Sequence, residues 1–100
     1  RLYNALHPSV IAVIADIVRI CKRRNKPVSI CGEAASRLDC ILLYIGMGAD
    51  RISMTPSIVP AAKQFIRSIR KSDAEKTLEA VMEMEDAHEI SKFLNKKVHK

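Results

Sequence analysis

The run PVSIC at residues 27–31, followed by Gly32, decides how this chain is interpreted. Residues 28–31 stand between a proline and a glycine, and two of the four are β-branched. A short run of this kind is typical of a buried strand. We therefore predict a strand at residues 28–31, and a second one at residues 51–55, which Pro56 ends.

Helical patterns surround both predicted strands. Before the first strand, apolar residues recur at three- and four-residue steps and predict a helix that Pro27 ends. We expect its apolar face to comprise Val10, Val13, Ile14, Ile17, Val18, Ile20 and Cys21. Between the strands, Ser36 and Asp39 form an N-cap signature, and Gly46 and Gly48 are expected to end that helix.

Three more helices are predicted after the second strand. The first starts at about residue 57 and is expected to turn its apolar face, Ile66 included, inward. Ser72 and Glu75 form a capping box that predicts the start of the next helix, with Met82 on its buried face. Asp86 is expected to start the last helix.

The order of helix, strand, helix, strand and helix is typical of parallel βα units, so the predicted fold class is α/β. Two parallel strands do not make a stable sheet, because parallel sheets are covered on both faces and contain more strands than this. The chain is therefore interpreted as a segment of a larger α/β domain. It opens with Arg1, and we expect its true N-terminus to lie upstream.

Composition narrows the possible functions. The net charge is +6, but aromatic residues make up only 4% of the chain, so the basic run at residues 22–26 is interpreted as a solvated helix end and no nucleic-acid partner is expected. The apolar stretch at residues 10–18 is broken by Asp16 and is far shorter than the roughly 20 residues of a membrane span. Three cysteines without a C-x-x-C spacing favour neither disulfides nor structural zinc and indicate a reducing, cytoplasmic setting.

Cys31 is the candidate for chemistry, because it closes a predicted strand. Side chains at the carboxyl ends of parallel strands line active sites in barrels and open sheets. A lone cysteine beside a strand is more often inert packing, so its position alone leaves both interpretations open.

Four segments in this chain carry a resemblance: LYNALHPSV at residues 2–10, CGE at 31–33, GMG at 46–48 and SM at 53–54. In this order and at similar spacing, they resemble the C-terminal domain of Enzyme I proteins of the phosphoenolpyruvate (PEP) phosphotransferase system, or of their nitrogen-related paralogue. Pyruvate phosphate dikinase and PEP synthase carry related cysteine segments, and the equivalent part of one of these is an alternative.

The resemblance implies a fold. The longer protein of which this chain would be part, here called the parent, would fold this domain as a (β/α)8 barrel. This chain would supply about the last two βα units at residues 1–71, and the C-terminal helices of the same domain at residues 72–100.

The resemblance also implies a reaction, in which the parent transfers the phosphoryl group of PEP to a protein histidine and releases pyruvate. Cys31 would donate a proton to the enolate, and the backbone of Gly32 would lie beside the substrate. Mg²⁺ would be bound by residues upstream, so no metal ligand is assigned here, neither Glu33 nor Asp50. An HPr-like phosphocarrier protein would be a partner, the parent would be a homodimer, and this segment alone would be inactive.

One departure from the family pattern follows the cysteine. Family members usually place Ala-Gly-Asp where this chain has Ala35-Ser36-Arg37, so the loop has lost a glycine and an acid. A second function class therefore stays open: a non-enzymatic protein-interaction module derived from a barrel, which binds a partner through its acidic terminal helices or its basic helix end.

Overall fold

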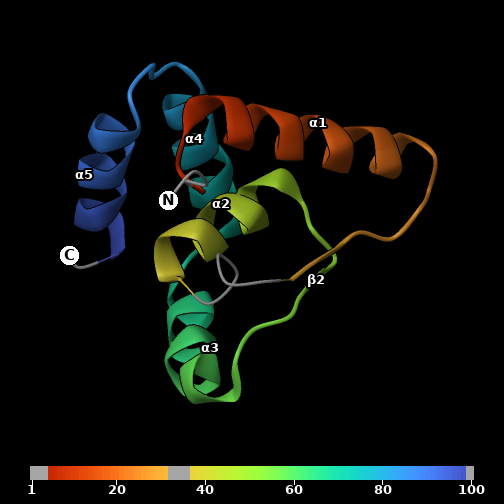
Figure 1. The fold of residues 1–100 in the computed structure, drawn as a ribbon. Helices are drawn as coiled ribbons and strands as arrows, with labels where there is room; N and C mark the ends of the chain where they lie inside the picture. Colours follow the sequence, from red (N-terminus) through yellow and green to blue (C-terminus); the bar gives the residue numbers. More distant parts are fainter. Residues whose placement is uncertain (1–4, 32–36, 99–100) are drawn as a thin grey trace.

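The computed structural model describes residues 5–31 and 37–98, which form five α-helices and two short strands (Figure 1). In chain order the elements are α1 (Pro8–Arg23), β1 (Ser29–Ile30), α2 (Leu38–Met47), β2 (Arg51–Ile52), the 3-10 turn η2 (Pro56–Ile58), α3 (Val59–Ser68), α4 (Lys71–Met82) and α5 (Ala87–Val98). The predicted order of elements is confirmed, and the fold is a mostly helical α/β arrangement.

The two strands pair in parallel. Ser29 lies opposite Arg51, and Ile30 lies opposite Ile52. Each strand has two residues, so both are shorter than predicted, although backbone bonds extend the pairing: Arg51 N donates to the Val28 carbonyl at 3.1 Å and Ser53 N donates to the Ile30 carbonyl at 2.8 Å. Within the described residues the sheet contains only this pair, and parallel strands are usually stabilised by neighbours on both sides.

Helix α1 ends four residues before the predicted stop at Pro27. Asn25 adopts a positive φ of 56°, and the next amide, Lys26 N, donates to the Cys21 carbonyl at 2.8 Å. A left-handed residue followed by a backward hydrogen bond closes a helix and satisfies its last carbonyls. The end of α1 is therefore set by Asn25, and Pro27 belongs to the connection to β1.

At the carboxyl end of α2, the structure confirms the prediction for Gly48 and corrects the one for Gly46. The N-cap of α2 is Arg37, which makes no side-chain capping bond, and the predicted cap Ser36 lies outside the described residues. Gly46 does not end the helix, which continues to Met47 and closes at Gly48 with a φ of 93°. Gly46 lies instead against α4, where a β-carbon would come within 2.5 Å of the Ala74 carbonyl oxygen.

The prediction for the start of α4 was wrong, and the prediction for the start of α5 is confirmed. The capping box at Ser72 and Glu75 was wrong, because α4 already begins at Lys71 and its N-cap Arg70 makes no side-chain capping bond. The prediction for Asp86 is confirmed, since its Oδ1 accepts a hydrogen bond from His88 N at 2.9 Å, directly before the first turn of α5.

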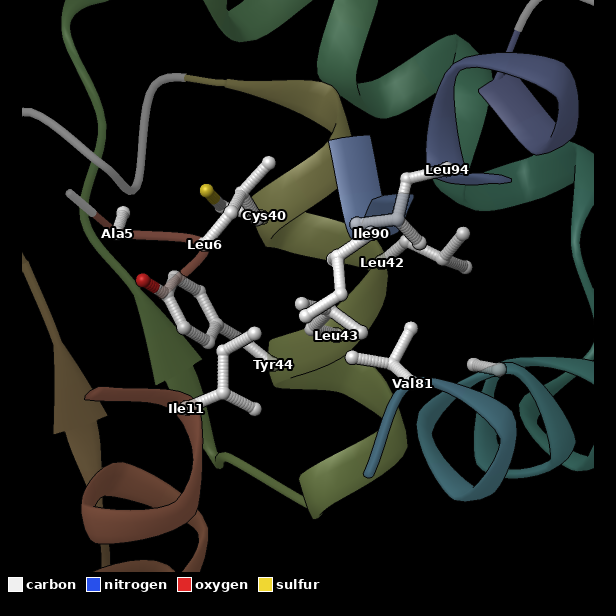
Figure 2. Close-up of a cluster of buried hydrophobic side chains, with 11 residues drawn as sticks. Ala5, Leu6, Ile11, Cys40, Leu42, Leu43, Tyr44, Val81, Ile90 and Leu94 are labelled. Atoms are coloured by element: carbon white, nitrogen blue, oxygen red, sulfur yellow. The ribbon is translucent and has the colours of Figure 1, made fainter. Parts of the chain in front are cut away.

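The core is centred on α2, which packs chiefly against α4 and also against α5 (Figures 1 and 2). Five consecutive α2 residues are buried: Cys40, Ile41, Leu42, Leu43 and Tyr44. A helix that is apolar on all sides is stable only when neighbours surround it. Figure 2 shows Leu42 and Leu43 of α2 near Val81 of α4 and Ile90 of α5, with Ile11 of α1 in the same cluster.

Part of the predicted apolar surface remains outside this core. On α1, Ile11 and Val18 are buried, but Val13, Ile17 and Ile20 are 57%, 53% and 47% exposed. These three residues, the α1 stripe, follow four- and three-residue steps along one side of the helix. The predictions that Ile66 and Met82 point inward were also wrong. Periodicity detected the apolar surface of these helices, and only the packing shows which side is covered.

Candidate functional site

Cys31 lies directly after β1 and is exposed. The exposure of the side chains alternates along the residues that lead to Cys31: Val28 is buried, Ser29 is exposed, Ile30 is half-buried and Cys31 is exposed. Successive side chains of a strand point to opposite faces, so Ser29 and Cys31 share one face, and the half-buried Ile30 lies on the other.

The neighbouring strand shows the same alternation. Arg51 and Ser53 are exposed, and Ile52 between them is half-buried. Since Ile30 pairs with Ile52, the exposed residues of both strands lie on the same side of the pair. We call this side the open sheet face, formed by Ser29, Cys31, Arg51 and Ser53.

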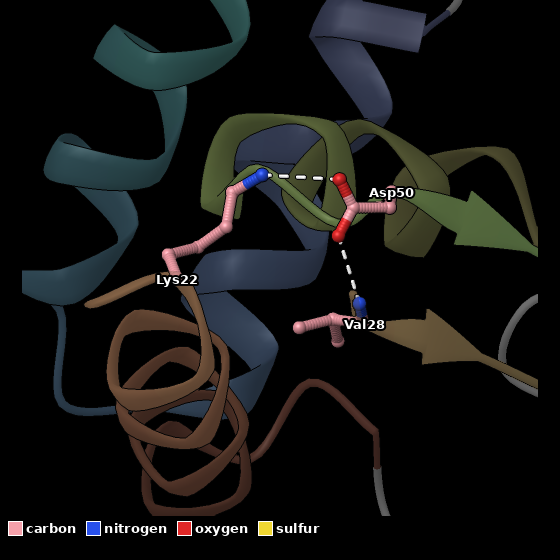
Figure 3. Close-up of polar contacts among 3 residues, drawn as sticks. All are labelled: Lys22, Val28 and Asp50. Carbon is pink, nitrogen blue, oxygen red and sulfur yellow. Dashed lines mark hydrogen bonds and ion pairs between the residues drawn. The ribbon is translucent and has the colours of Figure 1, made fainter. Parts of the chain in front are cut away.

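Asp50 fixes the other end of the strand pair (Figure 3). Its Oδ2 accepts a hydrogen bond from Val28 N at 2.8 Å, and its own amide donates to the Val28 carbonyl at 3.0 Å. Its Oδ1 accepts from Lys22 Nζ, 3.1 Å away at the end of α1. The Val28 amide, and then Lys22, lower the pKa of the Asp50 carboxyl. These bonds set the parallel register, and Cys31 follows three residues after Val28.

The sequence analysis gave Asp50 no role. The pattern that could have indicated one is an acidic residue directly before a predicted strand. Its oxygens are used by the Val28 amide and Lys22, so the structure assigns the side chain to strand pairing. Gly32 and Glu33, the other residues quoted beside Cys31, lie outside the described residues.

The other two cysteines sit in different surroundings. Cys40 is buried in the core, and burial, together with Asp39 beside it, raises the pKa of its thiol to about 12. Such a thiol stays protonated and unreactive at neutral pH. Cys21 is half-buried on α1. Cys31 is therefore the exposed cysteine of the three and the one placed at a strand end.

The larger pockets lie away from Cys31. One of about 560 Å³ is formed between α2, α3, α4 and α5, and one of about 580 Å³ is formed by β2 and the neighbouring ends of four helices. Cys31 lines neither. In the described parts of the chain, no three His, Cys, Asp or Glu residues gather closely enough to hold a metal ion. Nor is any described helix long and apolar enough to cross a membrane.

The carboxyl end of a parallel strand, where the exposed Cys31 lies, is the edge at which α/β proteins build their ligand sites. Residues 1–71 match the family described as PEP-utilising enzyme, PEP-binding domain, and the chain belongs to this family. The resemblance inferred from four short segments is thereby confirmed.

Several curated relatives match nearly the whole chain. It is 33% identical over 94 residues to the phosphoenolpyruvate-protein phosphotransferase of Haemophilus influenzae, a match that covers 94% of this chain and 16% of the relative. The protein of the same name from Buchnera aphidicola subsp. Schizaphis graminum is 34% identical, with 96% and 17% covered. An Escherichia coli protein named for the phosphoenolpyruvate-dependent phosphotransferase system is 30% identical, with 97% and 14% covered. The chain thus spans about a sixth of the length of these relatives.

Proposed function

We propose that this chain is the C-terminal part of a phosphoenolpyruvate-protein phosphotransferase, an enzyme that transfers the phosphoryl group of PEP to a protein histidine and releases pyruvate. Cys31 is the proton donor to the enolate that the transfer leaves behind. The observation that carries this proposal is the exposed thiol at the end of β1, in a chain that belongs to the PEP-binding domain family.

Cys31 transfers its thiol proton to a carbon atom of the enolate. The S–H bond of Cys31 breaks as a C–H bond forms at the methylene carbon of the enolate, which becomes the methyl group of pyruvate. The sulfur keeps the electron pair as a thiolate and regains a proton from solvent. In the reverse reaction, the thiolate removes a proton from the methyl group of pyruvate. A thiol is suited to this role, because an unperturbed cysteine titrates at about pH 8.5, close to working pH.

The rest of the active site is assigned to the parent. The Gly32 backbone is proposed to lie beside the substrate. Mg²⁺, which the family reaction implies, prefers several oxygen ligands, and the described residues gather no such set. As the family resemblance implies, we propose that parent residues upstream of this segment bind the metal. We also propose that the isolated chain has no phosphotransferase activity, because it spans about a sixth of the length of its relatives.

The fold of the parent domain is proposed to be a (β/α)8 barrel, with residues 1–71 as its last βα units. Two features support this: the parallel strands are joined through a helix, and the α1 stripe lacks a cover. Residues 72–100 are proposed to belong to the same domain, since α4 and α5 pack on α2. Names of relatives that refer to a phosphotransferase system support an HPr-like phosphocarrier as partner. A cytoplasmic homodimer completes the proposal for the parent.

The test is Cys31→Ser in the full-length parent, with exchange of solvent protons into the methyl group of pyruvate as the readout. We expect exchange to fall at least a hundredfold, the typical contribution of a positioned acid or base being about 10²–10⁴. Cys21→Ser is the matched control and is expected to exchange normally, because Cys21 lies on α1. Undiminished exchange in the Cys31→Ser enzyme would exclude the proposed role.

A non-enzymatic interaction module is the second candidate, and the α1 stripe is the observation that favours it. An apolar surface on a self-sufficient module is a site for a partner. Such a module is monodisperse and unfolds cooperatively by itself, whereas a severed barrel segment aggregates or stays partly molten. Sedimentation and denaturation of the 100-residue chain distinguish the two. A segment of pyruvate phosphate dikinase or PEP synthase is the further alternative, and the names of the relatives favour the phosphotransferase over it.

A further inference from the structure

The residue across the sheet from Cys31 is Ser53. The observed pairs are Ser29 with Arg51 and Ile30 with Ile52, so the next pair in register is Cys31 with Ser53. The bond from Ser53 N to the Ile30 carbonyl, at 2.8 Å, shows that the parallel pairing reaches this point. Neighbouring strands lie about 4.8 Å apart. Alternation along the two strands therefore places both side chains on the open sheet face, about one strand spacing apart.

The hydroxyl of Ser53 supplies what an ionising thiol needs. When Cys31 loses its proton, the sulfur becomes an anion, and a hydrogen bond donated to an anion is about twice as strong as one between neutral groups. A serine hydroxyl rotates freely between staggered positions and can either accept from the thiol or donate to the thiolate. Such a donor favours the charged form of the thiol and makes it a better acid.

The other groups on this face are less well placed. Ser29 is two residues before Cys31 on the same strand, about 6.6 Å away along it. Arg51 is the charged residue of the open sheet face, and it stands opposite Ser29. At the start of α2, Arg37 Nη2 and Asp39 Oδ2 pair with each other at 2.8 Å, while Asp50 is engaged at the far end of the strands.

We propose that Ser53 is a positioning residue for Cys31, donating a hydrogen bond to its sulfur as the proton leaves. This inference rests on the proposed function for its catalytic meaning, but the contact itself can be tested through the reactivity of the Cys31 thiol, without an activity assay. It adds the residue directly after β2 to a site that sequence reasoning confined to the end of β1.

The experiment measures the rate at which iodoacetamide alkylates Cys31 in the full-length parent at a series of pH values, followed by mass spectrometry of the Cys31 peptide. Ser53→Ala is expected to slow alkylation about threefold to tenfold at neutral pH. Ser53→Thr keeps a hydroxyl and is expected to restore the profile. Ser29→Ala, a loss of the same group on the same face, is expected to leave it unchanged.

Two results would overturn the inference: an unchanged profile in Ser53→Ala, or an equal shift in Ser29→Ala. Circular dichroism of each variant checks that the fold persists, which is expected because the Ser53 backbone bond remains. Arg51→Gln separates a long-range charge effect, which salt screens, from the hydrogen bond. If alkylation responds to Ser53 while Cys31→Ser leaves proton exchange in the parent intact, the contact is real and only the proposed function fails.

Discussion

Gly46→Ala is expected to destabilise the chain, although alanine is normally the better helix residue. Gly46 lies inside α2, on the side that packs against α4. A β-carbon there would lie 2.5 Å from the Ala74 carbonyl oxygen, 3.0 Å from the carbonyl carbon and 3.2 Å from the Leu78 β-carbon. Two of these three atoms belong to the backbone of α4 and cannot rotate away. The two helices must therefore move apart.

Two opposing effects set the size of the change. Replacing glycine by alanine inside a helix gains about 1 kcal/mol. Overpacking a tight contact costs about 1–3 kcal/mol, and a clash with backbone belongs at the upper end of that range. We therefore expect a net loss of about 1–2 kcal/mol in the free energy of unfolding. For a domain of this size each kcal/mol lowers Tm by roughly 4–8 °C.

Urea denaturation followed by circular dichroism measures this loss. The matched control compares Glu79→Ala with Glu79→Gly on an exposed position of α4, where the alanine variant is expected to be the more stable by about 1 kcal/mol. If Gly46→Ala were as stable as the unmodified chain while the control behaved normally, the close approach of α2 and α4 at this point would be refuted.

Three further outcomes are expected. The lowered pKa of Asp50 means that its bonds to the Val28 amide and to Lys22 stabilise the fold above about pH 4, the unfolded value, and are lost as pH falls through the folded pKa. Asp50→Asn should therefore flatten the dependence of the urea midpoint on pH between 2 and 5, and an unaltered slope would contradict the role of this carboxylate. Because the pKa of Cys40 is raised to about 12, iodoacetamide at pH 9 should label Cys31 at least tenfold faster than Cys40 until urea unfolds the chain; comparable rates in the native state would argue against the burial of Cys40. Ile17→Lys should weaken self-association of the 100-residue chain in sedimentation experiments, since it charges the α1 stripe, whereas the exposed control Arg19→Lys should not; equal association of all three proteins would show that the stripe is not the contact.

Local patterns in the sequence were enough for the order of elements and for some of their ends. The strand β1 could be predicted because a proline and a glycine bound a run that contains β-branched residues, although the strand is shorter than that run. The start of α5 could be predicted from Asp86, and the structure confirms that this residue caps the helix. The predictions for other helix ends were wrong, because a local pattern matched at a position where the helix does not begin or end. Ser72 and Glu75 match a capping box, yet α4 had already begun at Lys71.

By itself, the sequence determined the α/β order, the family and Cys31 as the candidate residue, because each depends on the identity or spacing of residues along the chain. Only the tertiary structure decided which side of α1 is covered, that Gly46 allows α2 and α4 to approach, and that Asp50 binds the Val28 amide. It also decided that Ser53 stands across from Cys31. These features depend on strand register and helix packing, which bring residues together that are about twenty or more positions apart, and no local pattern records such a contact.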